Sequence, residues 1–354
     1  MNQIRLPALK AVLTQMYRNG TEKDMLQNLY RFIVKSKAAD LLVMNPNFIA
    51  IRIGISHYRM LNLTVDGVLS GLFEMQWDIN CPRCGGIAGH EHKLGDIHEH
   101  SHCQRCRLDF DNYADQNITI SLSLHPKLLE GPAPDTPSMR TIDKRVAPVT
   151  VLDLIGIPKF REQFSDQIPD LDHSVKVRSV TLMFTDLIQS THIYNTLGDL
   201  KAYALVREHF EALFREITTN AGGVIKTIGD AVMAAFHDPV SAIKASLELK
   251  KAVNAILKKH KLFEVSGLKI GLASGPALVV NMNNILDLFG TTVNKAARIV
   301  SLADNDNIAV CQNTLNDPDM QNYMTEARHQ VITINEKLKG ISGLSQVALL
   351  RIPH

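Results

Sequence analysis

The spacing of apolar residues divides this chain into a helical first part and a mixed second part. In residues 25–34 and 58–75 apolar side chains recur three and four positions apart, which predicts helices. Residues 117–126 alternate between apolar and polar side chains, which predicts a strand. From about residue 178 the pattern predicts strands and helices in turn. We therefore expect two regions with different folds.

Within residues 178–354 the order of the predicted elements is βαββαβ, followed by further strands. The predicted strands are 179–186, 268–275, 307–311, 329–334 and 346–352, with a β-hairpin over 222–236. The predicted helices are 201–220, 239–259 and 291–303. This order is typical of an α+β domain in which helices cover one sheet.

The pattern weakens between the two regions. Residues 131–150 contain four prolines and few periodic apolar positions, which predicts a linker. Residues 151–177 form a connector with one short predicted helix. The sequence thus predicts an N-terminal, mostly helical region at 1–130, a linker and connector at 131–177, and an α+β domain at 178–354.

Composition and charge restrict the class of protein. The 354 residues are 45% apolar and carry a formal net charge of +2. Such a chain is globular, and its charge is too small to favour nucleic acid or an anionic membrane as its main partner. No apolar run reaches the roughly 18 residues of a membrane span, and the N-terminus lacks the pattern of a signal peptide. We expect a cytoplasmic protein without a membrane span.

Four of the five cysteines form two C-x2-C pairs. Cys81 and Cys84 are separated by 18 residues from Cys103 and Cys106, a spacing typical of a zinc ribbon. We therefore predict structural zinc over residues 81–106. The intervening segment has five histidines, which either bind a second metal or form a solvated polar loop: His90, His92, His98, His100 and His102. Acidic residues crowd the same segment, so no basic stripe for nucleic acid is present.

Two acids in the second region are candidates for metal binding. Asp186 ends an apolar strand, and Asp230 occupies the turn of the predicted hairpin. Taken singly, each is explained as a helix cap or a turn residue. At the same end of neighbouring strands, however, two carboxylates repel each other unless a cation joins them. Paired Mg²⁺ ions held in this way are a recurrent device for phosphoryl transfer.

Four further polar residues suggest nucleotide chemistry. Asn294 and Arg298 are four apart on a predicted helix and share a face, where Arg can meet charge on a pentavalent phosphorus and Asn can orient a ribose. The alternative is an exposed Arg and a surface Asn. Lys226 and Asp287 supply a donor and an acceptor that can read a base.

These residues stand in three segments: FTDLIQST (184–191), KTIGDAV (226–232) and LDLFGTTVNKAAR (286–298). With this order, and with 44 positions from Asp186 to Asp230, residues 178–354 resemble a class III adenylate/guanylate cyclase catalytic domain. The resemblance implies a ferredoxin-like βαββαβ core. It also implies a head-to-tail homodimer with active sites at the interface.

The resemblance also implies a role for each residue. Asp186 and Asp230, helped by the Leu187 carbonyl, would bind two Mg²⁺ or Mn²⁺ ions. Lys226 and Asp287 would read adenine, and Asn294 and Arg298 would stabilise the transition state. Lys339 would contact the terminal phosphates, although Ile341 stands where a second lysine is common in the family.

The expected activity is conversion of ATP to 3′,5′-cyclic AMP and pyrophosphate. Residues 44–52 and 71–86 resemble part of an N-terminal domain found before some bacterial cyclases, which implies that the N-terminal region is regulatory. Three alternatives are a cyclase of another nucleotide, a catalytically silent nucleotide-binding module that signals by conformation, and a zinc-ribbon nucleic-acid binder.

Overall fold

A computed structural model describes residues 4–131, 146–168, 174–262, 266–341 and 343–352. The chain divides into two compact units. The N-terminal unit comprises Met1–Lys176 and Val280–Leu286, and the C-terminal unit comprises Val177–Val279 and Asp287–His354. Most of the predicted linker, residues 132–145, lies outside the described residues.

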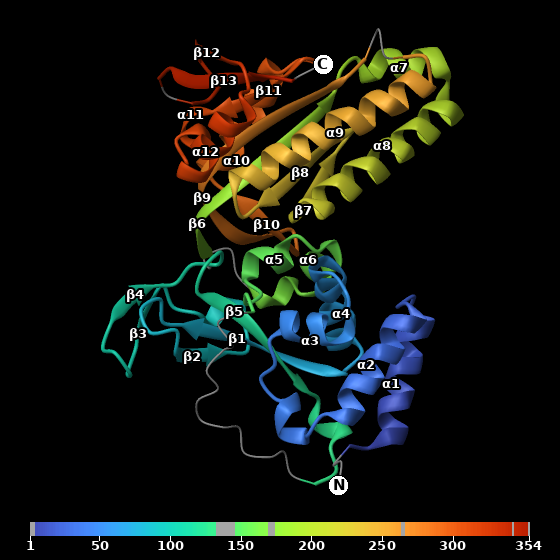
Figure 1. Ribbon diagram of the computed structural model, residues 1–354, viewed down its shortest axis with the longest axis vertical. Coiled ribbons are helices and arrows are strands. Elements are labelled where there is room, and N and C mark those ends of the chain that lie inside the picture. Colours follow the sequence, from blue (N-terminus) through green and yellow to red (C-terminus); the bar gives the residue numbers. More distant parts are fainter. Residues whose placement is uncertain (1–3, 132–145, 169–173, 263–265, 342, 353–354) are drawn as a thin grey trace. The chain divides into compact units, whose positions relative to one another are not determined.

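The N-terminal unit begins with a group of amphipathic helices (Figure 1). Helices of this unit are α1 (Leu6–Arg18), α2 (Lys23–Lys35), α3 (Pro46–Ile53), α4 (His57–Leu69), α5 (Val151–Ile155) and α6 (Pro158–Gln163). The predicted helix at 25–34 is confirmed. The one predicted at 58–75 ends earlier, at Leu69, because Gly71 adopts a φ of 68° and Phe73 begins a strand.

A three-stranded antiparallel sheet completes this unit. Its strands are β2 (Ile87–Glu91), β1 (Phe73–Asn80) and β5 (Ile118–Leu124), in that spatial order. The short strands β3 (His100–His102) and β4 (Asp109–Asp111) form a separate hairpin. The Trp77 indole is buried on one face of the sheet, where it packs against the edge of Phe160 and donates to Gln167 Oε1 at 2.8 Å. Part of the predicted connector thus packs with the N-terminal unit.

The C-terminal unit is built on an eight-stranded sheet. Its spatial order is β12-β13-β11-β9-β6-β8-β7, and β10 pairs with β9. The strands are β6 (Val175–Leu187), β7 (Gly222–Ile228), β8 (Ala231–Phe236), β9 (Leu268–Met282), β10 (Ile285–Phe289), β11 (Asn307–Cys311), β12 (Val331–Glu336) and β13 (Ser345–Arg351). The predicted strands are all present, but β9 is longer than expected and β10 was not predicted.

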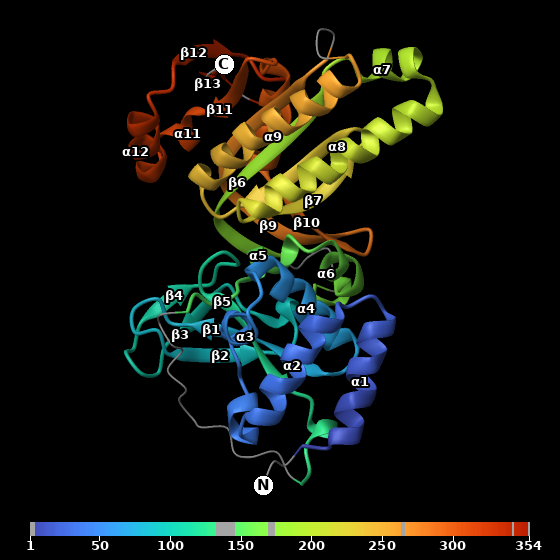
Figure 2. The ribbon, with the colours of Figure 1, turned by 45° about the vertical axis from the view of Figure 1, so that its right-hand side comes forward.

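Helices of very different length pack with this sheet. The helices are α7 (Ser190–Leu197), α8 (Asp199–Thr219), α9 (Pro239–Lys259), α10 (Thr291–Ile299), α11 (Gln312–Leu315) and α12 (Pro318–Ala327). Figures 1 and 2 show α8 and α9 side by side against one face of the sheet. Their apolar stripes bury Leu213 and Leu249 in one core with Met183 of β6. This arrangement leaves the ends of β6, β7 and β8 free to carry polar residues.

Candidate active site and cysteine cluster

Asp186 and Asp230 lie at the same end of the sheet. β6 and β8 are antiparallel, and Phe184 of β6 pairs with Met233 of β8, so the end of β6 meets the beginning of β8. Asp230 precedes β8 in a tight turn, after Gly229 with a φ of 63°. Burial, and then the charge of Asp230, raise the pKa of the Asp186 carboxyl above its ordinary value. The two acids therefore lie close enough to interact electrostatically.

The two acids fit a divalent cation. Asp230 Oδ2 is buried and makes no hydrogen bond to any described residue. A buried carboxylate oxygen without a partner costs free energy, which a bound cation offsets. Carboxylate and carbonyl oxygens are also the ligands that Mg²⁺ prefers. The Leu187 side chain is buried directly after Asp186, so its backbone carbonyl belongs to the same strand end.

Two buried side chains that the sequence analysis missed support this strand end. The Thr185 hydroxyl accepts a hydrogen bond from the Val232 backbone N–H at 2.9 Å. The His209 ring, in α8, places Nε2 3.3 Å from the backbone carbonyl oxygen of Asp230. Burial lowers the pKa of His209, so the ring is neutral and its Nε2–H donates to that carbonyl. The sequence did offer one signal that could have indicated this role, namely a histidine on the apolar face of the predicted helix at 201–220.

Lys226 and Asp287 meet directly. Lys226 Nζ of β7 lies 2.5 Å from Asp287 Oδ2 of β10, although the residues are 61 positions apart. The Asp287 side chain is mostly buried, and its other oxygen accepts from the Leu288 N–H at 2.8 Å. A donor and an acceptor of opposite charge are thus held side by side in one partly solvated place.

The remaining predicted residues stand apart from these two pairs. Asn294 and Arg298 are exposed on α10, four positions apart on one face. Lys339 is exposed between β12 and β13. Within the described part of the chain, no hydrogen bond or ion pair joins these three side chains to Asp186, Asp230, Lys226 or Asp287.

The four paired cysteines form one cluster in the N-terminal unit. Their sulfur atoms all lie within 4.8 Å of one another, with 3.5 Å from Cys81 to Cys106 and 3.7 Å from Cys84 to Cys103. These distances exclude disulfides, and all four thiols are free. Four thiolates arranged as a tetrahedron around zinc lie roughly 3.8 Å apart. Backbone N–H groups, first that of Cys106, lower the pKa of Cys103, whereas burial and then the neighbouring cysteines raise the pKa of Cys106, so in the absence of a metal the cluster shares protons among its thiols.

The neighbouring histidines make other contacts. His100 and His102 pair across the β3–β4 hairpin with Asp111 at 2.6 Å and Asp109 at 2.8 Å. Among the described residues, the four cysteines are the one group of three or more His, Cys, Asp or Glu side chains close enough to share a metal ion. The histidine-rich segment therefore contributes to a polar hairpin.

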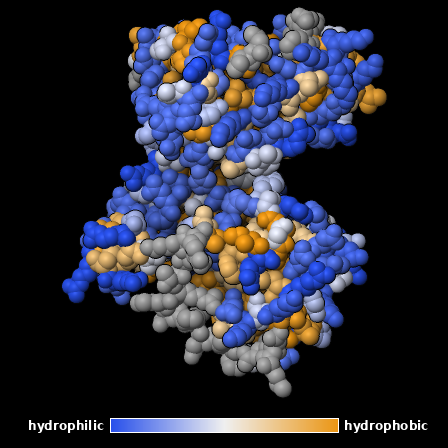
Figure 3. Space-filling model, viewed as in Figure 1, coloured by the Kyte–Doolittle hydropathy of each residue, from blue (hydrophilic) through white to orange (hydrophobic). Residues whose placement is uncertain are grey.

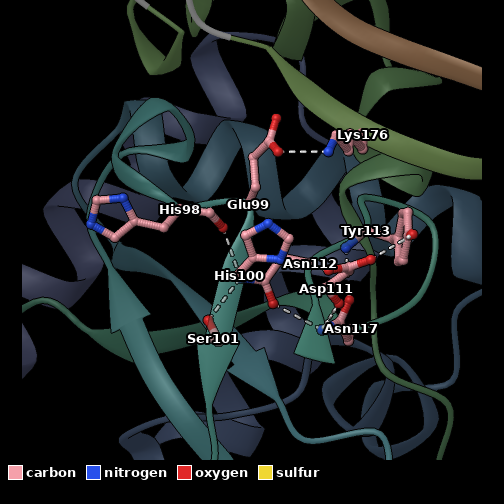
Figure 4. A network of polar contacts seen from close by, with 9 residues as sticks. All are labelled: His98, Glu99, His100, Ser101, Asp111, Asn112, Tyr113, Asn117 and Lys176. Atoms are coloured by element: carbon pink, nitrogen blue, oxygen red, sulfur yellow. Dashed lines mark hydrogen bonds and ion pairs between the residues drawn. The ribbon is translucent and has the colours of Figure 1, made fainter. Parts of the chain in front are cut away.

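A hydrogen-bond network stabilises this hairpin (Figure 4). Asn112 donates to the His98 carbonyl at 2.8 Å and to Ser101 Oγ at 2.7 Å, and it accepts from Asn117 at 3.0 Å. At the edge of the network Lys176 lies 2.6 Å from Glu99. Cys103 and Cys106 of the cluster lie in the loop of this hairpin, so the network fixes the strands on either side of them.

Comparison with known proteins adds to this geometry. Residues 173–341 match the family described as adenylate and guanylate cyclase catalytic domain. Residues 8–149 match a family of unknown function (DUF5939). The first match covers the part of the chain that holds all the polar pairs of the candidate active site.

Curated and solved relatives are of both nucleotide types. The chain is 31% identical over 140 residues to an adenylate cyclase of Streptomyces griseus, which covers 39% of this chain and 32% of that protein. It is 26% identical over 146 residues to guanylate cyclase 32E of Drosophila melanogaster, covering 38% and 13%. The adenylyl cyclase CyaB from P. aeruginosa aligns with a TM-score of 0.45 at 16% identity, over 51% of this chain and 97% of that one.

The chain therefore spans a third or less of the length of these two curated relatives. Among the described residues, no helix has the length and apolar character needed to cross a membrane.

Proposed function

Residues 173–341 belong to the adenylate and guanylate cyclase catalytic domain family and have the class III cyclase fold, and on this premise we propose that the protein is an adenylate cyclase. It converts ATP to 3′,5′-cyclic AMP and pyrophosphate. The observation that carries the choice of ATP is the contact of 2.5 Å between Lys226 and Asp287.

The chemistry of the base explains this choice. Lys226 donates to adenine N1, and Asp287 accepts from the exocyclic amine. Guanine has a carbonyl oxygen where adenine has its exocyclic amine, and an N–H where adenine has the unprotonated N1. Asp287 and Lys226 therefore both lose their hydrogen-bond partners. Because the two side chains bind each other in this structure, adenine has to separate them, and its two hydrogen bonds replace the ion pair.

The acids at the end of β6 and β8 position the phosphates. Asp186, Asp230 and the Leu187 carbonyl would hold two Mg²⁺ or Mn²⁺ ions, which would lower the pKa of the ribose 3′-hydroxyl and neutralise charge on the leaving pyrophosphate. In the reaction the 3′-oxygen forms a bond to the α-phosphorus, the bond from that phosphorus to pyrophosphate breaks, and the hydroxyl proton passes to solvent water.

The exposed face of α10 completes the site from a second chain. Asn294 orients the ribose, Arg298 meets the charge that grows on the pentavalent phosphorus, and Lys339 contacts the terminal phosphates. Their exposure makes them accessible to the metal site of a partner in a homodimer. Every chain carries the full set, so a symmetric dimer holds two sites.

The cysteine cluster is a structural zinc site. The distances between its four sulfur atoms support zinc, and free thiols are typical of a reducing, cytoplasmic compartment. The N-terminal unit regulates the cyclase domain. The ligand of the protein is ATP, bound at the cyclase site, and not nucleic acid.

Product analysis tests the proposal. The full chain is incubated with ATP, GTP, CTP and UTP together, with Mg²⁺ or Mn²⁺, and the products are separated by chromatography. We expect cyclic AMP from the native protein and none from Asp186→Ala or Asp230→Ala. Asp199→Ala, which removes an exposed carboxylate at the start of α8, serves as the control and keeps the activity.

Each other outcome has a defined meaning. Cyclic GMP as the main product contradicts the assignment of Lys226 and Asp287. If no cyclic product forms but the protein still binds nucleotide, the protein is a catalytically silent signalling module and not an enzyme. Full activity in both aspartate variants contradicts the metal site.

A further inference from the structure

A cavity of about 410 Å³ lies in the N-terminal unit, between α2, α3 and the three-stranded sheet. Its volume is within the range of small-molecule sites, roughly 300–1,000 Å³. The walls are largely apolar and include Phe32 of α2, Phe48 of α3 and Ile87 of β2. Figure 3 shows apolar side chains gathered on the visible face of this unit. The cavity belongs to neither the cyclase site nor the cysteine cluster.

The sheet contributes a buried polar floor. Asp78 pairs with Thr119 and Gln76 pairs with Ser121 across β1 and β5, so Asp78 and Ser121 lie diagonally on one face of the sheet. Both line the cavity, and Asp78 is only 3% exposed and Ser121 only 4%. Burial raises the pKa of the Asp78 carboxyl above its ordinary value, and the nearby Ser121, Gln76 and His90 side chains oppose this rise only in part. The Ser121 hydroxyl makes no hydrogen bond of normal geometry to any described residue.

Asp78 is not paired with a Lys or Arg side chain among the described residues. Gln76 Nε2 donates to Asp78 Oδ1 at 3.0 Å. His90, opposite Asp78 on β2, is exposed, and when charged it lowers the pKa of Asp78 only in part against the effect of burial. Asp40 and Arg52, which are exposed and oppositely charged, also line the cavity, and the Arg52 guanidinium lies 5.7 Å from the centre of the Phe48 ring, where a cationic ligand would have to displace it. A buried carboxylate without a cation is costly, so the cavity favours a positive group.

From these contacts we propose that the cavity is a binding site for a small organic cation. The ligand has a flat or compact apolar body that packs between Phe32, Phe48 and Ile87. Its N–H donors bind the Asp78 carboxylate and the Ser121 oxygen. Neither an anion nor a purely apolar compound satisfies the polar floor, because each leaves Asp78 desolvated and unpaired.

Benzamidine is a suitable probe, because it joins a phenyl ring to an amidinium with several N–H donors. Benzoate has the same shape with the opposite charge, and benzamide has the same shape without charge. Binding to the full chain is measured by saturation-transfer NMR and calorimetry, without nucleotide, so the result does not depend on cyclase activity. We expect benzamidine to bind with a Kd on the order of 1 mM, a strength typical of a ligand this small.

Two variants locate the binding. Asp78→Asn removes the charge and should weaken benzamidine binding at least tenfold. Ile87→Trp fills the cavity from β2, where the native side chain is 40% exposed, and should have a similar effect without changing the floor. Leu69→Trp, at a position 45% exposed and outside the cavity lining, is the matched control and should bind normally.

The proposal is overturned if benzamidine does not bind at about 10 mM, ten times the expected Kd. It is also overturned if benzoate binds as well as benzamidine, or if a folded Asp78→Asn variant binds benzamidine as the native protein does. If Asp78→Asn does not fold, Ile87→Trp decides the question: retained binding places the cation elsewhere.

Discussion

The hydroxyl of Thr185 accepts a hydrogen bond of 2.9 Å from the backbone N–H of Val232. Both residues are almost fully buried. Thr185 directly precedes Asp186, and Val232 follows Asp230 by two positions. Together with the pairing of β6 and β8, this contact joins the two strand ends that carry Asp186 and Asp230, the acids proposed to bind metal, so it helps to set how far apart their carboxylates lie.

Replacing Thr185 tests this link. Thr185→Val keeps the shape but leaves the Val232 N–H buried without a partner, so unfolding free energy should fall by about 1–3 kcal/mol. Misplaced carboxylates should lower turnover by about tenfold or more. Urea denaturation and the initial rate of cyclic AMP formation measure the two effects. Thr185→Ser keeps the hydroxyl and is the control; equal behaviour of the two variants contradicts the positioning role.

Asp186 predicts a dependence on pH. Its pKa in the folded protein is raised above the ordinary value, so the folded state holds this proton more tightly than the unfolded chain. Stability of the metal-free protein should therefore fall as the pH rises from about 4 through the raised pKa. Mg²⁺ or Mn²⁺ competes with the same proton and should bind more tightly as the pH rises. Thermal unfolding with and without metal measures both trends, and Asp186→Asn should abolish this contribution to each.

His209 predicts the opposite dependence. Burial lowers its pKa, so the unfolded chain binds a proton that the folded protein does not. The stability that depends on the neutral ring is present above about pH 6.5 and is lost as the pH falls below it. His209→Leu should flatten the stability profile in this acid range and lower turnover, because the Asp230 carbonyl loses its donor.

His209→Gln is the matched variant, since its amide can still donate. Unfolding curves between pH 5 and 8, together with cyclase rates at pH 8, separate the two effects. Native-like turnover in both variants shows that His209 does not position the Asp230 turn.

Removal of zinc should affect the N-terminal unit. Metal analysis of the purified chain should give one zinc per chain, and Cys84→Ser should lose it. Because zinc binding contributes directly to folding in small sites, this variant should also unfold at a lower temperature. Cys311→Ser changes a buried thiol in β11, away from the cluster, and should keep its zinc. Full zinc content in Cys84→Ser contradicts the four-cysteine site.

Local pattern was sufficient for much of the C-terminal fold. The apolar stripes of α8 and α9 and the alternation in the strands depend on neighbours three or two positions away, which the sequence displays directly. β10 was missed because its five residues lie next to the glycine and helix start that dominate that segment. The sheet of the N-terminal unit was mostly missed, since its β1 continues an apolar helical pattern through Gly71.

The sequence by itself determined the types of residue, their spacing along each element and the grouping of the cysteines. Only the tertiary structure placed Lys226 against Asp287, His209 beneath the Asp230 carbonyl, and the buried Asp78 and Ser121 in one cavity. A periodic pattern records which side of an element is apolar. It does not record which distant element packs against that side, because this choice depends on the shape and burial of the whole core.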